Sequence, residues 1–147
     1  MSIQDQLLDA MKVAMKAKDS LRLTTIRMAR TALKNVEIDT RQELDEAAAI
    51  KVLSTLVKQR REAAEAYRET RPELAEKEEL EVVILQEFLP AQLSEAEIEA
   101  LVAKAVAESG AGSMKDMGAV MKLVPPQTTG RADGKMVSNL VRKLLAG

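Results

Sequence analysis

The sequence has 147 residues and contains neither cysteine nor histidine. Without cysteine, the chain cannot form a disulfide framework, a thiol nucleophile, a thiolate zinc site or an iron–sulfur cluster. Without histidine, it cannot form a Ser-His-Asp triad, an imidazole metal ligand or a histidine proton shuttle. Only Asp, Glu, Lys, Ser, Thr and one tyrosine remain for catalysis. We therefore predict no catalytic residues, no bound metal and no cofactor.

Aromatic residues and long apolar runs are also scarce. Aromatics make up 1% of the sequence, namely Tyr67 and Phe88, so stacking of RNA bases on aromatic rings can contribute little. No stretch approaches the roughly 20 apolar residues of a membrane-spanning helix. The first residues mix apolar side chains with Asp5 and Asp9, unlike a secretory signal. We therefore expect a cytoplasmic protein that does not contact a membrane.

The composition that is present is globular, with 46% hydrophobic and 31% charged residues. The net charge of -1 hides an uneven distribution along the chain. Residues 1–38 carry a net +3, residues 39–89 a net -5, residues 90–112 a net -3 and residues 113–147 a net +4. Two basic ends around an acidic middle indicate separate interaction surfaces.

Helical periodicity is nearly continuous, and no long stretch alternates with a period of two. The pattern predicts an all-α protein of seven helices, four in an N-terminal helical hairpin unit and three in a C-terminal bundle. Polar residues suited to helix N-caps mark most of the predicted starts. These residues are Asp19 or Ser20, Asp45, Ser94 with Glu97, Ser113 with Asp116, and Asp133.

Glycine and proline mark the other predicted boundaries. Arg71-Pro72 separates the third helix from the fourth, which ends near Phe88. Residues 110–112 end the fifth helix, and Pro125-Pro126 end the sixth, so that residues 127–131 form a loop. Residues 90–93 form a linker between two domains, at 1–89 and 94–147.

Three other patterns carry little functional weight. Two glycines and a lysine in GRADGK, residues 130–135, resemble a phosphate loop but lack its spacing and its preceding strand. The carboxylates of Glu76, Glu78, Glu79 and Glu81 are typical of a solvated helix face. Methionines 114, 117 and 121 could line a partner groove, but such a stripe is more typical of a core that is poor in aromatics.

Two lines of polar and basic residues are the candidate binding sites. In the second helix, Arg27, Arg30 and Lys34 recur with helical spacing, opposite an apolar face of Ala29, Leu33 and Val36. In the last helix, Lys135, Asn139 and Arg142 recur with similar spacing, and Arg131 precedes them. Each line could follow a phosphate backbone, or could be an ordinary solvated helix face.

Several motifs, taken in this order, resemble the stand-alone YqeY proteins of the GatB/YqeY family over essentially the whole chain. They are LRLTTIRM at 21–28, VKQRR at 57–61, FLPAQLS at 88–94, KDMGAVM at 115–121 and GRADGK at 130–135. The resemblance implies a helical N-terminal unit followed by a small three-helix unit. It also implies similarity to the C-terminal module of the GatB component of aspartyl/glutamyl-tRNA amidotransferase, a module that touches tRNA.

The resemblance associates the chain with carbon–nitrogen ligase activity that uses glutamine as the amide donor. No residues of its own support that activity. Three functions remain open. They are a tRNA-binding module, a protein–protein adaptor in an amidotransferase or other translation complex, and an amidotransferase with an unrecognised site. We favour the first, with Arg131, Lys135, Asn139 and Arg142 as its main tRNA-facing line, near the positive end of the last helix.

Overall fold

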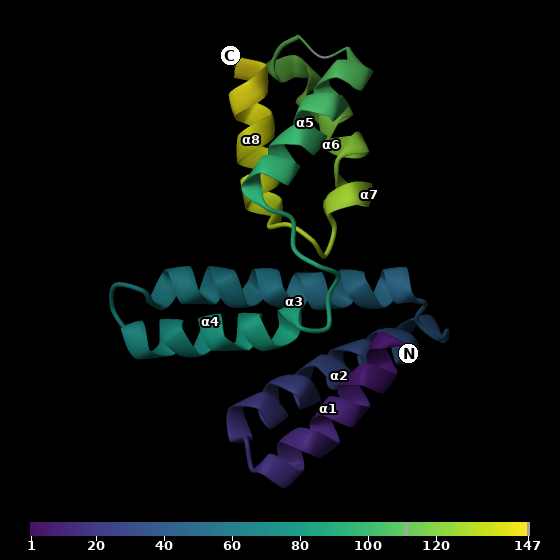
Figure 1. Ribbon diagram of the computed structural model, residues 1–147, viewed down its shortest axis with the longest axis vertical. Helices are drawn as coiled ribbons and strands as arrows, with labels where there is room; N and C mark the ends of the chain where they lie inside the picture. Colours follow the sequence, from purple (N-terminus) through teal and green to yellow (C-terminus); the bar gives the residue numbers. More distant parts are fainter. Residues whose placement is uncertain (111, 147) are drawn as a thin grey trace. The chain divides into compact units, whose positions relative to one another are not determined.

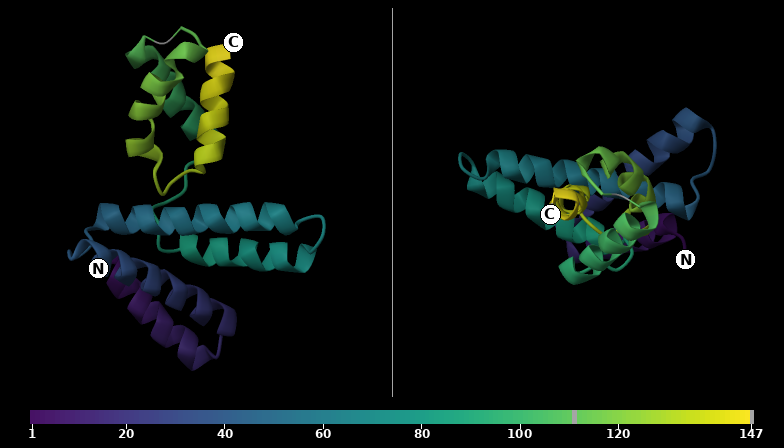
Figure 2. Two further views of the ribbon diagram at one scale, coloured as in Figure 1. Left: turned by 180° about the vertical axis from the view of Figure 1, so that it is seen from behind. Right: turned by 90° about the horizontal axis from the view of Figure 1, so that it is seen from above.

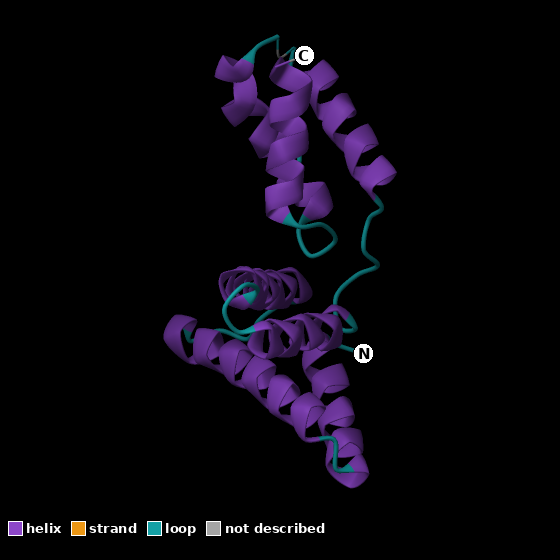
Figure 3. Ribbon diagram, turned by 90° about the vertical axis from the view of Figure 1, so that its left-hand side faces the viewer, coloured by secondary structure: helices purple, strands orange, loops and turns teal. Residues whose placement is uncertain are grey.

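The computed structural model describes residues 1–110 and 112–146. These residues form helices and loops and no strand, so the prediction of an all-α protein is confirmed (Figures 1 and 3). In chain order the helices are α1 (Ile3–Ala17), α2 (Ser20–Thr40), α3 (Glu46–Tyr67), α4 (Pro72–Gln86), α5 (Glu95–Ser109), the 3-10 helix η1 (Met114–Asp116), α6 (Met117–Leu123), α7 (Pro125–Thr128) and α8 (Gly134–Ala146).

The chain divides into two compact units, unit 1 (Met1–Pro90) and unit 2 (Ala91–Gly147). Unit 1 consists of two helical hairpins, one formed by α1 and α2 and the other by α3 and α4 (Figures 1 and 2). Helix α2 also packs against α3 and α4, so it joins the two hairpins. Whether each unit folds without the other stays a prediction.

The core of unit 1 is aliphatic, with Phe88 as its one aromatic residue. Burying a leucine or isoleucine side chain contributes about 1.5–3 kcal/mol, so these contacts dominate the stability of the unit. The buried side chains are Ile3, Leu7, Ala14, Ile26, Ala29, Leu33, Ala49, Leu53, Val57, Val82, Leu85 and Phe88.

One ion pair is buried between α3 and α4. Arg60 Nε lies 3.2 Å from Glu81 Oε2, and the two side chains are 9% and 8% exposed. The Nε–H of Arg60 makes no hydrogen bond within the described residues, so the contact is electrostatic. The guanidinium also donates to Leu56 O at 3.4 Å and lies 3.7 Å from Met28 Sδ. The prediction that Glu81 belongs to a solvated carboxylate face is therefore wrong, because the packing of α4 on α3 buries it.

The predicted helix caps of unit 1 are confirmed. Asp19 Oδ1 accepts from the Arg22 N–H at 3.2 Å, and Asp45 Oδ1 accepts from the Ala48 N–H at 2.8 Å. Each carboxylate satisfies an amide that the first helical turn leaves without a partner. Local sequence therefore determines where α2 and α3 begin.

Unit 2 is built on α5, α6 and α8, which contact one another. Its buried side chains are Ile98, Val102, Ala105, Val120, Val124, Val137, Leu140, Val141 and Leu145. Met117 and Met121 pack against this core, as the core interpretation of the methionines predicts, whereas Met114 is 45% exposed. The predicted capping box of Ser94 and Glu97 is present at the start of α5. Gly110 ends α5 with a φ of 69°, and Ala111 of the same stop signal lies outside the described residues.

Two short helices were not predicted. Pro125 begins α7 instead of ending all helical structure, and η1 precedes α6. Proline fits the first turn of a helix because the N–H that it lacks has no helical partner there. The predicted loop at 127–131 therefore begins later, after Thr128.

The segment that precedes α5 is held to the loop that precedes α8. The Leu93 N–H donates to Arg131 O at 2.7 Å, and Gln92 Nε2 donates to Gly130 O at 2.8 Å. The Arg131 Nε–H donates to Ala91 O at 3.2 Å. We call these three bonds the clasp. They make residues 91–93 part of unit 2 instead of a free linker.

We predict that the fragment of residues 91–147 unfolds cooperatively and that the fragment of residues 94–147 is less stable. The shorter fragment loses the clasp, whose three bonds contribute about 1 kcal/mol each, and also the packing of Leu93 against the core of unit 2. Urea unfolding followed by circular dichroism measures the difference, which we expect to be at least about 2–3 kcal/mol. Equal stabilities would show that the clasp contributes nothing, and an unfolded longer fragment would show that unit 2 needs unit 1.

We predict that Glu81→Leu destabilises unit 1 by about 3–5 kcal/mol, because it leaves the Arg60 charge buried without its partner. The double variant Arg60→Leu/Glu81→Leu should lie within about 1 kcal/mol of the wild type, because it removes both charges. Fluorescence of Tyr67, the single tyrosine, reports the unfolding of unit 1 in urea. A double variant as unstable as the single one would contradict this account of the pair.

Candidate nucleic-acid interface

The basic line of unit 2 lies on the exposed side of α8. Lys135, Asn139 and Arg142 are exposed. The opposite side of the helix is buried against α5 and α6 through Val137, Leu140, Val141 and Leu145. The three polar side chains therefore face solvent along about two turns of one helix. This is the arrangement that their spacing predicts, and their contact with RNA stays a prediction.

Arg131 differs from the rest of its predicted line. It is half-buried, and it takes part in the clasp through both its Nε–H and its backbone carbonyl. A guanidinium has five N–H donors, so the bond to Ala91 uses only one of them. Arg131 thus has a structural role that the sequence did not indicate, in addition to its predicted role in binding.

The Glu97 carboxylate lies near enough to Arg131 for the two charges to interact. The pKa of Glu97 is held below its ordinary value, first by the Ser94 N–H that donates to its carboxylate, then by the Ser94 hydroxyl and, more weakly, by the Arg131 charge. Burial acts in the opposite direction. Glu97 is therefore ionised at neutral pH, and its negative charge offsets part of the potential of Arg131. Lys135 and Arg142 are consequently the stronger candidates for contact with an anion.

The N-terminal end of α8 has an internal cap. Asp133 Oδ1 accepts from the Lys135 N–H at 3.1 Å, which confirms the predicted cap. A phosphate at this helix end would compete with that carboxylate for the free amides. The Lys135 amide therefore already has a partner, and the exposed side chains of α8 remain the stronger candidates for binding an anion.

The basic line of unit 1 lies beside α1. Arg27 and Lys34 are exposed, whereas Arg30 is half-buried, with its Nη1 3.1 Å from Met11 Sδ of α1. The sequence placed this line opposite the apolar face of α2. The structure instead places Arg30 at the edge of that face, because α1 packs beside it. Whether these residues contact RNA stays a prediction.

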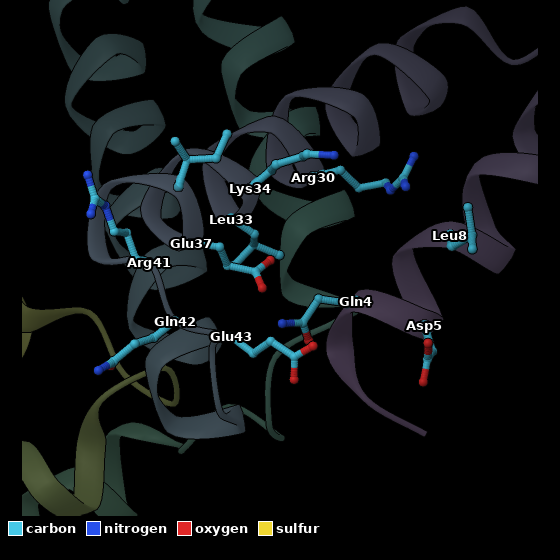
Figure 4. A pocket seen from close by; sticks show the side chains of 11 residues that line it. Gln4, Asp5, Leu8, Arg30, Leu33, Lys34, Glu37, Arg41, Gln42 and Glu43 are labelled. Carbon is cyan, nitrogen blue, oxygen red and sulfur yellow. The ribbon is translucent and has the colours of Figure 1, made fainter.

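A cleft of about 590 Å³ adjoins this line (Figure 4). Arg30 and Lys34 extend along one edge, and Glu37 points toward Gln4 and Glu43 on the other side. The residues that line the cleft are Gln4, Asp5, Leu8, Arg30, Leu33, Lys34, Glu37, Ile38, Arg41, Gln42 and Glu43. They come from α1, α2 and the loop between α2 and α3, and Gln4 Nε2 donates to Leu44 O of that loop at 3.4 Å.

Sequence reasoning missed the carboxylates of this cleft. Glu37 and Glu43 share no motif with Gln4, from which more than 30 residues separate them. Only the folding of α1 against α2 brings them together.

The described residues form neither a metal site nor a membrane-spanning helix. Within residues 1–110 and 112–146, no group of three acidic side chains is placed to hold a metal ion. In the same residues, no helix is both long enough and apolar enough to cross a membrane.

Comparison with known proteins identifies relatives of the chain. A family model described as Yqey-like protein matches residues 4–145, as the motifs predicted. Altered inheritance of mitochondria protein 41, mitochondrial, of Lachancea thermotolerans is 43% identical over 103 residues, which is 67% of this chain and 54% of that protein. The protein of the same name from Eremothecium gossypii is 41% identical over 97 residues, 65% of this chain and 52% of that protein. The chain therefore spans about half the length of these curated relatives.

The names of these relatives contradict the predicted cytoplasmic location, because both are mitochondrial proteins. The prediction rested on the lack of an apolar run and on a polar start of the chain. Neither feature distinguishes one aqueous compartment from another.

Proposed function

This chain belongs to the YqeY-like protein family, and on that premise we propose that it is an RNA-binding helical module that contacts tRNA and has no catalytic site of its own. The observation that carries the proposal is the exposed line of Lys135, Asn139 and Arg142, which α8 presents opposite its buried face. The surrounding segment, residues 113–147, has a net charge of +4. The names of the relatives add a mitochondrial location to the proposal.

Contacts to phosphate supply the affinity in this proposal. Lysine and arginine neutralise phosphates and release the counterions condensed on the RNA. The amide of Asn139 can donate to a phosphate or a sugar oxygen without adding charge. With few aromatic residues, the contacts of the α8 line depend on the backbone and shape of a folded RNA, such as tRNA. The resemblance to the tRNA-contacting module of the amidotransferase supports the choice of tRNA, and the proposal assigns no amide transfer to this chain.

A protein–protein adaptor is the second candidate, and one feature of α4 favours it. This helix buries Val82 and Leu85 but also exposes Leu80, at 47%, and Val83, at 60%, on its other side. Glu73 and Glu76 are exposed on the same helix, within the acidic segment of residues 39–89. A partner for this face would offer an apolar surface with basic neighbours.

The affinity for tRNA should fall as salt rises. We predict that Lys135→Gln/Arg142→Gln makes the slope of log affinity against log salt shallower by about 1.4–1.8, because each substitution removes one contact to a phosphate. Helicity should be unchanged, since both side chains are exposed. The measurement is a salt titration of tRNA binding to the full chain. Lys115→Gln/Lys122→Gln is the matched control, because it removes the same charge from exposed positions outside α8.

An equal loss in the two variants would show that net charge, and not the α8 line, determines binding. A loss confined to Arg27→Gln/Lys34→Gln would place the interface on unit 1. If the wild-type chain binds no tRNA at low salt, the RNA-binding proposal is wrong and the adaptor becomes the first candidate.

A further inference from the structure

The cleft between α1 and α2 presents charges of both signs that have no ion-pair partner among the described residues. Arg30, Lys34 and Glu37 follow one another along α2, and the Glu37 side chain points toward Glu43 of the loop between α2 and α3 (Figure 4). Ion pairs among the described residues involve the cations Arg22, Arg60, Arg68 and Lys104. None of these cations lines the cleft. The hydrogen-bonding capacity of the two carboxylates is therefore available to a ligand.

The cleft also offers apolar surface. Leu8 is half-buried in its wall, and Ile38 is 62% exposed, although it lies on a helix with a well-packed opposite face. A ligand that fits must therefore combine an anionic group, a flat or apolar body and several N–H donors. A volume of about 590 Å³ is ample for a single nucleotide and lies in the usual range of small-molecule sites.

We propose that this cleft binds one unpaired nucleotide of the RNA, with a preference for guanine. The phosphate lies against Lys34 and Arg30, and the base lies against Leu8 and Ile38. The Watson–Crick edge of the base donates to the carboxylates of Glu37 and Glu43. This inference rests on the proposed RNA-binding function and adds a base preference to it.

The chemistry of the carboxylates selects guanine. An ionised carboxylate only accepts hydrogen bonds, so it requires a base edge with adjacent donors. Guanine offers two neighbouring donors, N1–H and the 2-amino group. Uracil has one N–H between two carbonyl oxygens, which repel a carboxylate, and adenine and cytosine each offer an amino group beside an acceptor nitrogen. Bases of single-stranded or looped RNA expose this edge to proteins.

The test uses the full chain and three oligouridylates that differ at one central position, which carries guanine, inosine or uracil. Inosine carries the base hypoxanthine, which is guanine without the 2-amino group. We expect the guanine oligonucleotide to bind roughly tenfold more tightly than either of the others, as for a good two-donor contact to a base. Glu37→Gln should remove that preference, because an amide has one acceptor oxygen and adds donors that oppose those of guanine.

Glu62→Gln is the matched control, because Glu62 is an exposed glutamate of α3 outside the cleft and its loss should leave the preference unchanged. Lys34→Gln should weaken binding of all three oligonucleotides by a similar factor. Circular dichroism checks that each variant keeps the helicity of the wild type.

The outcomes distinguish a failure of the nucleotide-site proposal from a failure of the RNA-binding proposal. If the chain binds tRNA but the three oligonucleotides bind equally, or if Glu37→Gln keeps the preference for guanine, the nucleotide site is wrong and the proposed function stands. If the chain binds neither tRNA nor any oligonucleotide, both proposals are wrong.

Discussion

The packing of α8 against α5 and α6 is the constraint on which the account of unit 2 depends. Val137, Leu140, Val141 and Leu145 face the core, because together they form the apolar side of α8 that packs against α5 and α6. With about 3.6 residues per turn, this requirement turns Lys135 and Arg142 toward water. The core fixes the rotation of α8 and therefore the side on which its cations lie. The backbone that carries them is already ordered, so anion binding costs little backbone conformational entropy.

Local features of the structure could be predicted from the sequence, because neighbouring residues determine them. The caps at Asp19, Asp45 and Asp133 and the capping box of Ser94 and Glu97 all have the predicted roles. Helix α7 was missed because a proline that ends one helix also suits the first turn of another. The single turn η1, which contains no proline, was missed as well.

Features that depend on distant residues could not be predicted. The clasp joins Ala91 to Arg131, and the buried ion pair joins Arg60 to Glu81 across a helical hairpin. In both cases an arginine that looks like a surface cation in the sequence has a specific internal partner. The carboxylates of the cleft are the same kind of case, since Glu43 reaches its neighbours only when α1 packs on α2. Basic residues of this chain therefore have to be assigned to binding or to structure one at a time.

Chemical footprinting of lysine side chains tests the central claim, that α8 presents the RNA-binding line, most directly. The full chain is treated with an amine-reactive reagent with and without tRNA, and the modification of each lysine is measured by mass spectrometry. We expect tRNA to protect Lys135 strongly, while Lys115, Lys122 and the acidic-segment Lys77, all exposed, keep their reactivity. Unchanged reactivity of Lys135 in a saturated complex, or protection centred on Lys77, would contradict it.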